Sequence, residues 1–85
     1  SANTNVEMYN ITNQKESTYL VEGVAKSVAS YDNIIAINLG SEVDFINTNG
    51  WLVKRYTSRQ EIRNIVICDG IAGIIYRDKI ELVNL

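Results

Sequence analysis

The sequence contains no histidine, and Cys68 is its only cysteine. Without histidine, the chain cannot form the Ser-His or Cys-His pairs of nucleophilic catalysis or the usual Cys/His zinc sites. A single cysteine also excludes a disulfide within the chain. Cys68 ends the apolar segment Ile65–Cys68, so we predict that it is a small, buried hydrophobic side chain. We therefore expect no enzymatic activity, no metal and no cofactor in this chain.

Long apolar runs are also missing. No stretch approaches the ~20 apolar residues of a membrane helix, so we expect no membrane contact by this segment itself. The chain begins Ser1-Ala2-Asn3 rather than with methionine, which is typical of a cleaved tag. We expect residues 1–5 to be a tag remnant or a disordered start. Residues 6–85 are then one β-repeat region from a longer bacterial protein, either cytoplasmic or the extracytoplasmic part of a membrane-anchored parent.

The charged residues are unevenly distributed, although the net charge is only −2. Residues 54–85 carry six basic and four acidic side chains, and four of the basic ones cluster around a tyrosine. This cluster is a candidate interaction patch, which consists of Lys54, Arg55, Tyr56, Arg59 and Arg63. The alternative is a solvated strand and loop. The acidic overall balance argues against a nucleic-acid partner.

A similar segment occurs three times along the chain. Val6–Asn10, Val43–Asn47 and Ile80–Asn84 each read aliphatic, acidic, apolar, apolar, asparagine, and they start 37 residues apart. The same offset aligns Tyr19 with Tyr56. So many matches at one fixed offset indicate an internal repeat of about 37 residues.

Each repeat contains short strands separated by turns, which predicts an all-β fold with antiparallel pairing. Asp32-Asn33 and Asp69-Gly70 suit tight hairpins because both dipeptides tolerate positive φ. Asn33–Leu39 and Ile71–Tyr76 carry apolar residues on both faces, as in strands covered on both faces of a sheet.

Two further stretches are more polar. Trp51–Thr57 mixes aromatic and basic residues and reads as an exposed outer edge, whereas Asn13–Glu22 reads as a loop that becomes strand-like at Thr18–Val21. Replacing Val43 or Phe45 should therefore destabilise the fold more than replacing Lys54 or Arg55.

Four carboxylates recur at equivalent positions of the repeat. Asp32 and Asp69 lie in equivalent turns, while Asp44 and Glu81 lie in equivalent strands. Because an active site is normally singular, repetition indicates a structural role. We expect turn formation for the first pair and solvent-facing positions for the second.

The pattern resembles the blades of β-propellers of the quinoprotein-like and related bacterial types. The segment Glu42–Trp51 carries this resemblance, since a strand ends in an Asn-Gly turn and an aromatic residue opens the next strand. More loosely, the chain is similar to an uncharacterised bacterial family with an N-terminal membrane anchor and a propeller-like outer region. The resemblance implies four-stranded antiparallel blades; a small β-sandwich or barrel is the alternative.

The length of the chain limits what such blades can form. Its 85 residues hold about 2.3 repeats, whereas propellers close with about 4–8 blades. We therefore expect a fragment of a larger propeller, with open strand edges that pair with other chains.

The favoured function is a non-catalytic binding or scaffold module that contacts a protein partner or self-associates through strand edges. One alternative is the non-catalytic portion of a propeller enzyme, to which Asp32 or Asp69 contributes. The other is a small oligomeric β-barrel that binds nucleic acid through residues 54–63.

Overall fold

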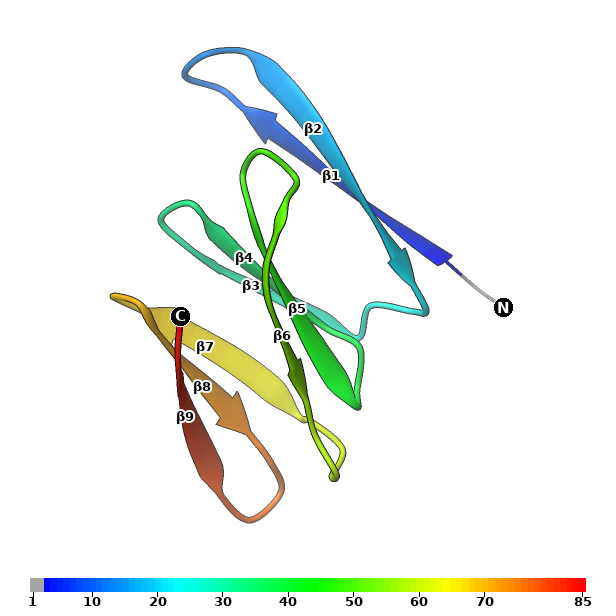
Figure 1. Ribbon diagram of the computed structural model, residues 1–85, viewed down its shortest axis with the longest axis vertical. Helices are drawn as coiled ribbons and strands as arrows, with labels where there is room; N and C mark the ends of the chain where they lie inside the picture. Colours follow the sequence, from blue (N-terminus) through cyan, green and yellow to red (C-terminus); the bar gives the residue numbers. More distant parts are fainter. Residues whose placement is uncertain (1–2) are drawn as a thin grey trace.

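The computed structural model describes residues 3–85, which form nine β-strands and no helix (Figure 1). The strands are β1 (Asn3–Asn10), β2 (Lys15–Glu22), β3 (Ser27–Tyr31), β4 (Ile34–Asn38), β5 (Glu42–Asn47), β6 (Leu52–Thr57), β7 (Asn64–Cys68), β8 (Ile71–Ile75) and β9 (Ile80–Asn84). Every pair of neighbouring strands is antiparallel. The prediction of an all-β, antiparallel fold is confirmed. No helix in the described range could cross a membrane.

The strands form three separate sheets, which follow one another in chain order. The first sheet is β1-β2, the second is β3-β4-β5-β6 and the third is β7-β8-β9. Figure 1 shows them fanned side by side, with the four-stranded sheet between the other two. None of the three closes on itself within residues 3–85.

Two tight turns connect β3 to β4 and β7 to β8. Tyr31 pairs with Ile34 across the first turn and Cys68 with Ile71 across the second, so each loop has two residues. Asp32 has a φ of 56° and Asp69 a φ of 48°. Aspartate tolerates this left-handed conformation better than most residues. The hairpins predicted at these two positions are therefore confirmed.

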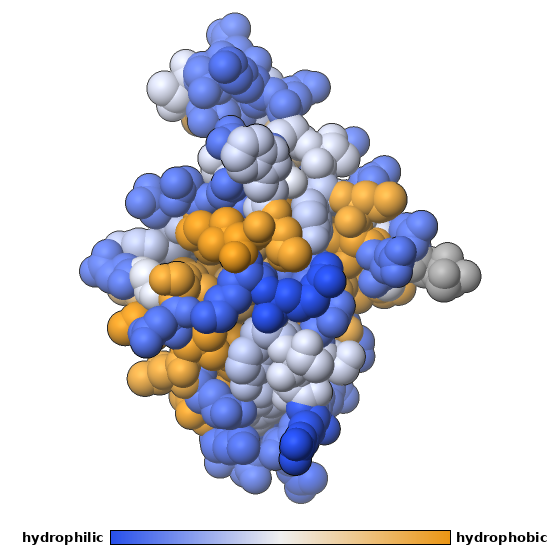
Figure 2. Space-filling model, viewed as in Figure 1, coloured by the Kyte–Doolittle hydropathy of each residue, from blue (hydrophilic) through white to orange (hydrophobic). Residues whose placement is uncertain are grey.

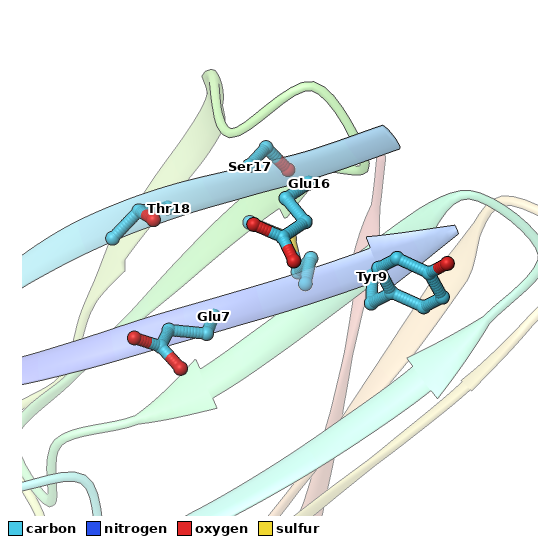
Figure 3. Close-up of a pocket in the computed structure, with 6 residues that line it drawn as sticks. Glu7, Tyr9, Glu16, Ser17 and Thr18 are labelled. Atoms are coloured by element: carbon cyan, nitrogen blue, oxygen red, sulfur yellow. The ribbon is translucent and has the colours of Figure 1, made fainter. Parts of the chain in front are cut away.

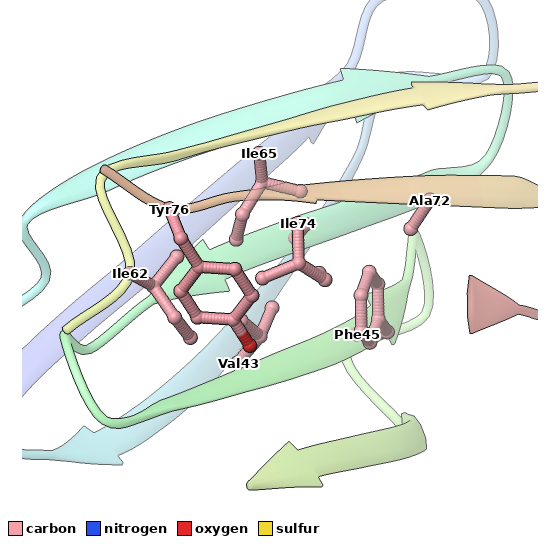
Figure 4. Packing of buried hydrophobic residues seen from close by; sticks show 8 residues of the cluster. Val43, Phe45, Ile62, Ile65, Ala72, Ile74 and Tyr76 are labelled. Atoms are coloured by element: carbon pink, nitrogen blue, oxygen red, sulfur yellow. The ribbon is translucent and has the colours of Figure 1, made fainter. Parts of the chain in front are cut away.

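The larger hydrophobic core lies between the four-stranded sheet and β7-β8-β9 (Figure 4). Val43 and Phe45 contribute from β5, and Ile65 and Ile74 from β7 and β8. Val43, Phe45 and Ile74 are completely buried. Full burial of side chains of this size stabilises the fold by about 1.5–3 kcal/mol each relative to exposure.

A second, smaller core covers the opposite face of the four-stranded sheet. Val21 of β2 packs there with Ile37 and Ile46, and all three are buried. Ala36 and Ile37 are adjacent in β4 yet belong to the two different cores. The prediction that Asn33–Leu39 is covered on both faces is thus confirmed for β4.

The corresponding prediction for Ile71–Tyr76 is wrong for one face. Ala72 and Ile74 point into the larger core, but Ile71 on the other face is 43% exposed. No element within residues 3–85 covers this outer face of β8. Local sequence cannot predict this difference, because β4 and β8 are equally apolar.

Two boundaries at the start of the chain also differ from expectation. Asn3–Asn5 belong to β1 and pair with Leu20–Glu22, so they are not a disordered start; Ser1 and Ala2 lie outside the described residues. β2 begins at Lys15, where the sequence predicted a loop. The polar residues of both segments form strands because each supplies hydrogen bonds to the other along the full hairpin.

Strand pairing recurs at a constant interval along the chain. Val6 pairs with Tyr19, and 37 residues later Val43 pairs with Tyr56. Likewise β3 and β7 begin 37 residues apart, as do β4 and β8. Residues at this offset therefore occupy matching positions in neighbouring sheets, which permits direct comparison of their surroundings.

Candidate interaction surfaces

Asp44 of β5 is a buried carboxylate, contrary to the prediction that it faces solvent. Its side chain is 2% exposed, and Arg55 lies directly across from it on β6. Arg55 donates from Nε to Oδ1 at 2.7 Å and from its terminal nitrogen to Oδ2 at 3.1 Å. Tyr19 of β2 donates its hydroxyl to Oδ2 at 3.1 Å. This Asp44 site joins the first two sheets through one fully satisfied acid.

The electrostatics of the Asp44 site follow from these bonds. Burial raises the pKa of Tyr19, and the hydrogen bond to Asp44 raises that pKa further. The hydrogen bonds to Asp44 also raise the pKa of Arg55 above its ordinary value. Both shifts favour the protonated form, so Tyr19 and Arg55 remain hydrogen-bond donors to Asp44.

Glu81 of β9 occupies the matching position in the third sheet, 37 residues after Asp44. Tyr56, which matches Tyr19, donates its hydroxyl to Glu81 Oε1 at 3.1 Å. Tyr76 lies 3.0 Å from the Tyr56 hydroxyl oxygen, and Ser58 donates to Tyr76 at 2.9 Å. The Tyr76 contact, desolvation and Glu81 together raise the pKa of Tyr56.

The Glu81 site lacks one component that the Asp44 site has. β9 has β8 as its only neighbour in the described residues, so no strand places an arginine across from Glu81. The nearest cation is Lys79, whose Nζ lies 3.9 Å from Oε1, and both side chains are almost half exposed. Such an exposed pair contributes at most about 1 kcal/mol. Glu81 therefore remains accessible at an open sheet edge.

The predicted interaction patch is divided between different surroundings. Lys54 donates to the Asn84 carbonyl oxygen at 2.8 Å, while Arg55 binds Asp44 on the opposite face of β6. Tyr56 is occupied by Tyr76 and Glu81. Arg59 and Arg63 are exposed in the connection between β6 and β7. Since side chains alternate along a strand, neighbours in the sequence do not form one basic surface here.

One part of the patch does meet other charged residues. Tyr56 and Arg59 line a hollow of about 270 Å³ together with Lys79 and Glu81. A matching hollow of about 320 Å³ beside Asp44 is lined by Glu22, Glu42, Asp44 and Arg55. Glu22 and Glu42 match Arg59 and Lys79 at the 37-residue offset, so the flanking charges are reversed between the two hollows.

The other carboxylates of the predicted sites lie on turns. Asp69 accepts a hydrogen bond from the Tyr31 hydroxyl at 3.1 Å, which raises the pKa of Tyr31. Asp32 and Asp69 line one hollow where the two hairpin turns meet. Residues 3–85 contain no group of three or more potential metal-ligating acids or cysteines. The outer face of β1-β2 forms another hollow, lined by the side chains that Figure 3 shows.

The outer face of β7-β8-β9 is apolar and exposed. We call it the outer apolar face and define it by Val66, Ile71, Ile80 and Leu82 around Gly73. Their exposed fractions are 53%, 43%, 61% and 76%. Val66 and Leu82 flank Gly73 in register, and a methyl group on Gly73 would lie 2.9 Å from Val66 Cγ2. Figure 2 shows hydrophobic residues gathered over the side where Figure 1 places these strands.

Cys68 lies on the same sheet and is exposed, so the prediction of a buried cysteine is wrong. It is the last residue of β7, at the turn to β8, and pairs with Ile71. Ile65 and Ile67, in contrast, pack into the larger core on the other side of the strand.

Comparison of the chain with protein-family models, with curated proteins and with solved structures gave no match.

Proposed function

We propose that this chain is a non-catalytic binding or scaffold module, built as a fragment of a β-propeller, that acts through protein–protein contact. The observation that carries this proposal is the outer apolar face. Its residues match Ala29, Ile34, Val43 and Phe45 of the middle sheet at the 37-residue offset. Those residues are packed beneath β7-β8-β9 in the larger core. The apolar pattern is therefore covered by another sheet in β3-β4-β5-β6 and exposed in β7-β8-β9.

The occupant that fits the open face is another β-sheet with aliphatic side chains. For the chain by itself, we propose that a second copy supplies it, face to face through the same residues. No charged side chain on this face would repel the same face of a second copy. The remaining positions on the face are Asn64, Cys68, Ile75 and Asn84. An exposed apolar surface of this kind favours association.

The expected strength of this association is low. Full burial of an aliphatic side chain contributes about 1.5–3 kcal/mol. Because these side chains are already about half buried in the monomer, association can gain roughly half of that from each. The loss of translational and rotational freedom offsets much of this gain. We therefore expect a reversible dimer that forms only at high concentration.

Light scattering across a concentration series tests the proposal. The unmodified chain should shift from monomer to dimer, whereas Val66→Lys should remain monomeric because a buried lysine without a partner is costly. Val24→Lys is the matched control, since Val24 is 61% exposed but lies in the loop between β2 and β3. An unmodified chain that stays monomeric throughout, or a Val66→Lys variant that still dimerises, would contradict the proposal.

A further inference from the structure

Within residues 3–85, one edge of β9 has no partner strand, and it presents backbone groups at defined positions. Leu85 donates its backbone N–H to Gly70, and Lys79 accepts at its carbonyl from Tyr76, both at 2.9 Å. Lys79 and Leu85 therefore direct their backbone groups toward β8. The residues that alternate with them along β9 direct their backbone groups away from β8, toward the open edge. Ile80 and Leu82 therefore offer N–H and C=O groups at the open edge.

The matching edge of β5 is already occupied. There β6 pairs antiparallel, with Arg55 opposite Asp44 and Thr57 opposite Glu42. At the open edge Glu81 replaces Asp44 and Lys79 replaces Glu42. A complementary strand on β9 thus needs a cation opposite Glu81 and an anion opposite Lys79.

The surroundings of the open edge support this charge pattern. The hollow beside Glu81 is lined by Arg59 as well as Lys79. A carboxylate of the incoming strand, placed across from Lys79, would therefore meet two cations. The contact of Lys79 with Glu81 is long and exposed, and Lys79 Nζ also lies 5.5 Å from the centre of the Tyr76 ring. An incoming guanidinium can then bind Glu81 as Arg55 binds Asp44.

We propose that β9 binds an extended segment of a partner protein that carries the pattern Arg-x-Glu. The segment pairs antiparallel with β9, and it places its arginine across from Glu81 and its glutamate across from Lys79. Backbone hydrogen bonds to Ile80 and Leu82 provide the affinity, and the two charge pairs set the register. This inference rests on the proposed role as a binding module and names the chemistry of its partner.

Two synthetic peptides of identical composition test it. The first has the sequence of residues 51–58 with Thr57→Glu, which creates the required pattern. The second carries Arg55→Glu and Thr57→Arg, which exchanges the two charges. Titrations into the full chain, at concentrations where it is monomeric, are followed by amide chemical shifts. The first peptide should shift Ile80 and Leu82 and bind about tenfold tighter than the second, because two cross-strand pairs change sign.

A charge-exchanged chain provides the decisive control. In the double variant Glu81→Lys and Lys79→Glu, the preference between the two peptides should invert. Equal binding of both peptides, shifts located on β1 or β2, no inversion, or no binding of either peptide would overturn the inference. Selective binding by a chain that never dimerises would retain this edge site and reject the face-to-face proposal. Dimerisation without selective peptide binding would retain the face-to-face proposal and reject the edge site.

Discussion

Replacement of Arg55 should destabilise the protein far more than replacement of its neighbour Lys54. Both are cations on β6, and the side chain of Arg55 is 49% exposed. Only Arg55 binds a buried acid: its partner Asp44 is 2% exposed and also accepts from Tyr19. Arg55→Met keeps the aliphatic part of the side chain and removes the guanidinium. Asp44 then retains one neutral donor, the Tyr19 hydroxyl.

The magnitude follows from this change in surroundings. Breaking a buried ion pair by removing one partner costs about 3–5 kcal/mol. The half-exposed position of Arg55 admits some water to Asp44 in the variant, so we expect a loss of about 2–3 kcal/mol in the free energy of unfolding. Lys54→Met removes a single exposed hydrogen bond to Asn84, and surface changes of this kind usually stay within about 0.5 kcal/mol.

Urea unfolding followed by circular dichroism provides the measurement. Arg55→Met should lower the midpoint clearly, whereas Lys54→Met should leave it nearly unchanged. Asp44→Leu added to Arg55→Met should recover part of the loss, because no unpaired charge then remains. Equal midpoints for the Arg55 and Lys54 variants would refute this account of Asp44.

Three other outcomes follow from the same structure. Phe45→Ala removes a fully buried ring and should cost about 3–5 kcal/mol in urea unfolding; a loss below about 1 kcal/mol would contradict the larger core. The folded-state pKa of Tyr56 is raised, so its stabilising effect is present below the unfolded value of about 10 and is lost as the pH rises through the folded value. Stability measured from neutral to strongly alkaline pH should therefore fall less in Tyr56→Phe than in the unmodified chain, and parallel curves would argue against the Glu81 site. Native Cys68 should react fully with a thiol reagent without denaturant, and protection until unfolding would show that it is buried.

The positions of strands and turns could be predicted because they depend on local chemistry. Asp32 and Asp69 tolerate positive φ, and the apolar segments that flank them are short and rich in β-branched residues. The start of the chain was less predictable. Asn3–Asn5 and Lys15–Ser17 are polar, and they become strands because the two segments pair with each other along one hairpin.

The candidate sites could be predicted only in part. The sequence places an acid at Asp44 and Glu81 and a tyrosine at Tyr19 and Tyr56, all at the same 37-residue offset. That coincidence was the available signal for a tyrosine–carboxylate contact between sheets. The grouping of Lys54, Arg55 and Tyr56 into one patch followed proximity in the chain. Alternation along β6 instead turns Arg55 toward Asp44, while Lys54 and Tyr56 point to the other face and contact β9.

The sequence by itself determined that the chain is all-β, that hairpins turn at Asp32 and Asp69, and which side chains match at the 37-residue offset. Tertiary structure alone decided that Asp44 is buried while Glu81 stays open, and that β4 is covered on both faces while β8 is covered on one. The reason is physical: conformational preference is a property of a few neighbouring residues, whereas burial depends on which sheet stacks against which face. Residues 37 positions apart in the sequence therefore acquire different environments according to whether another sheet lies beside them.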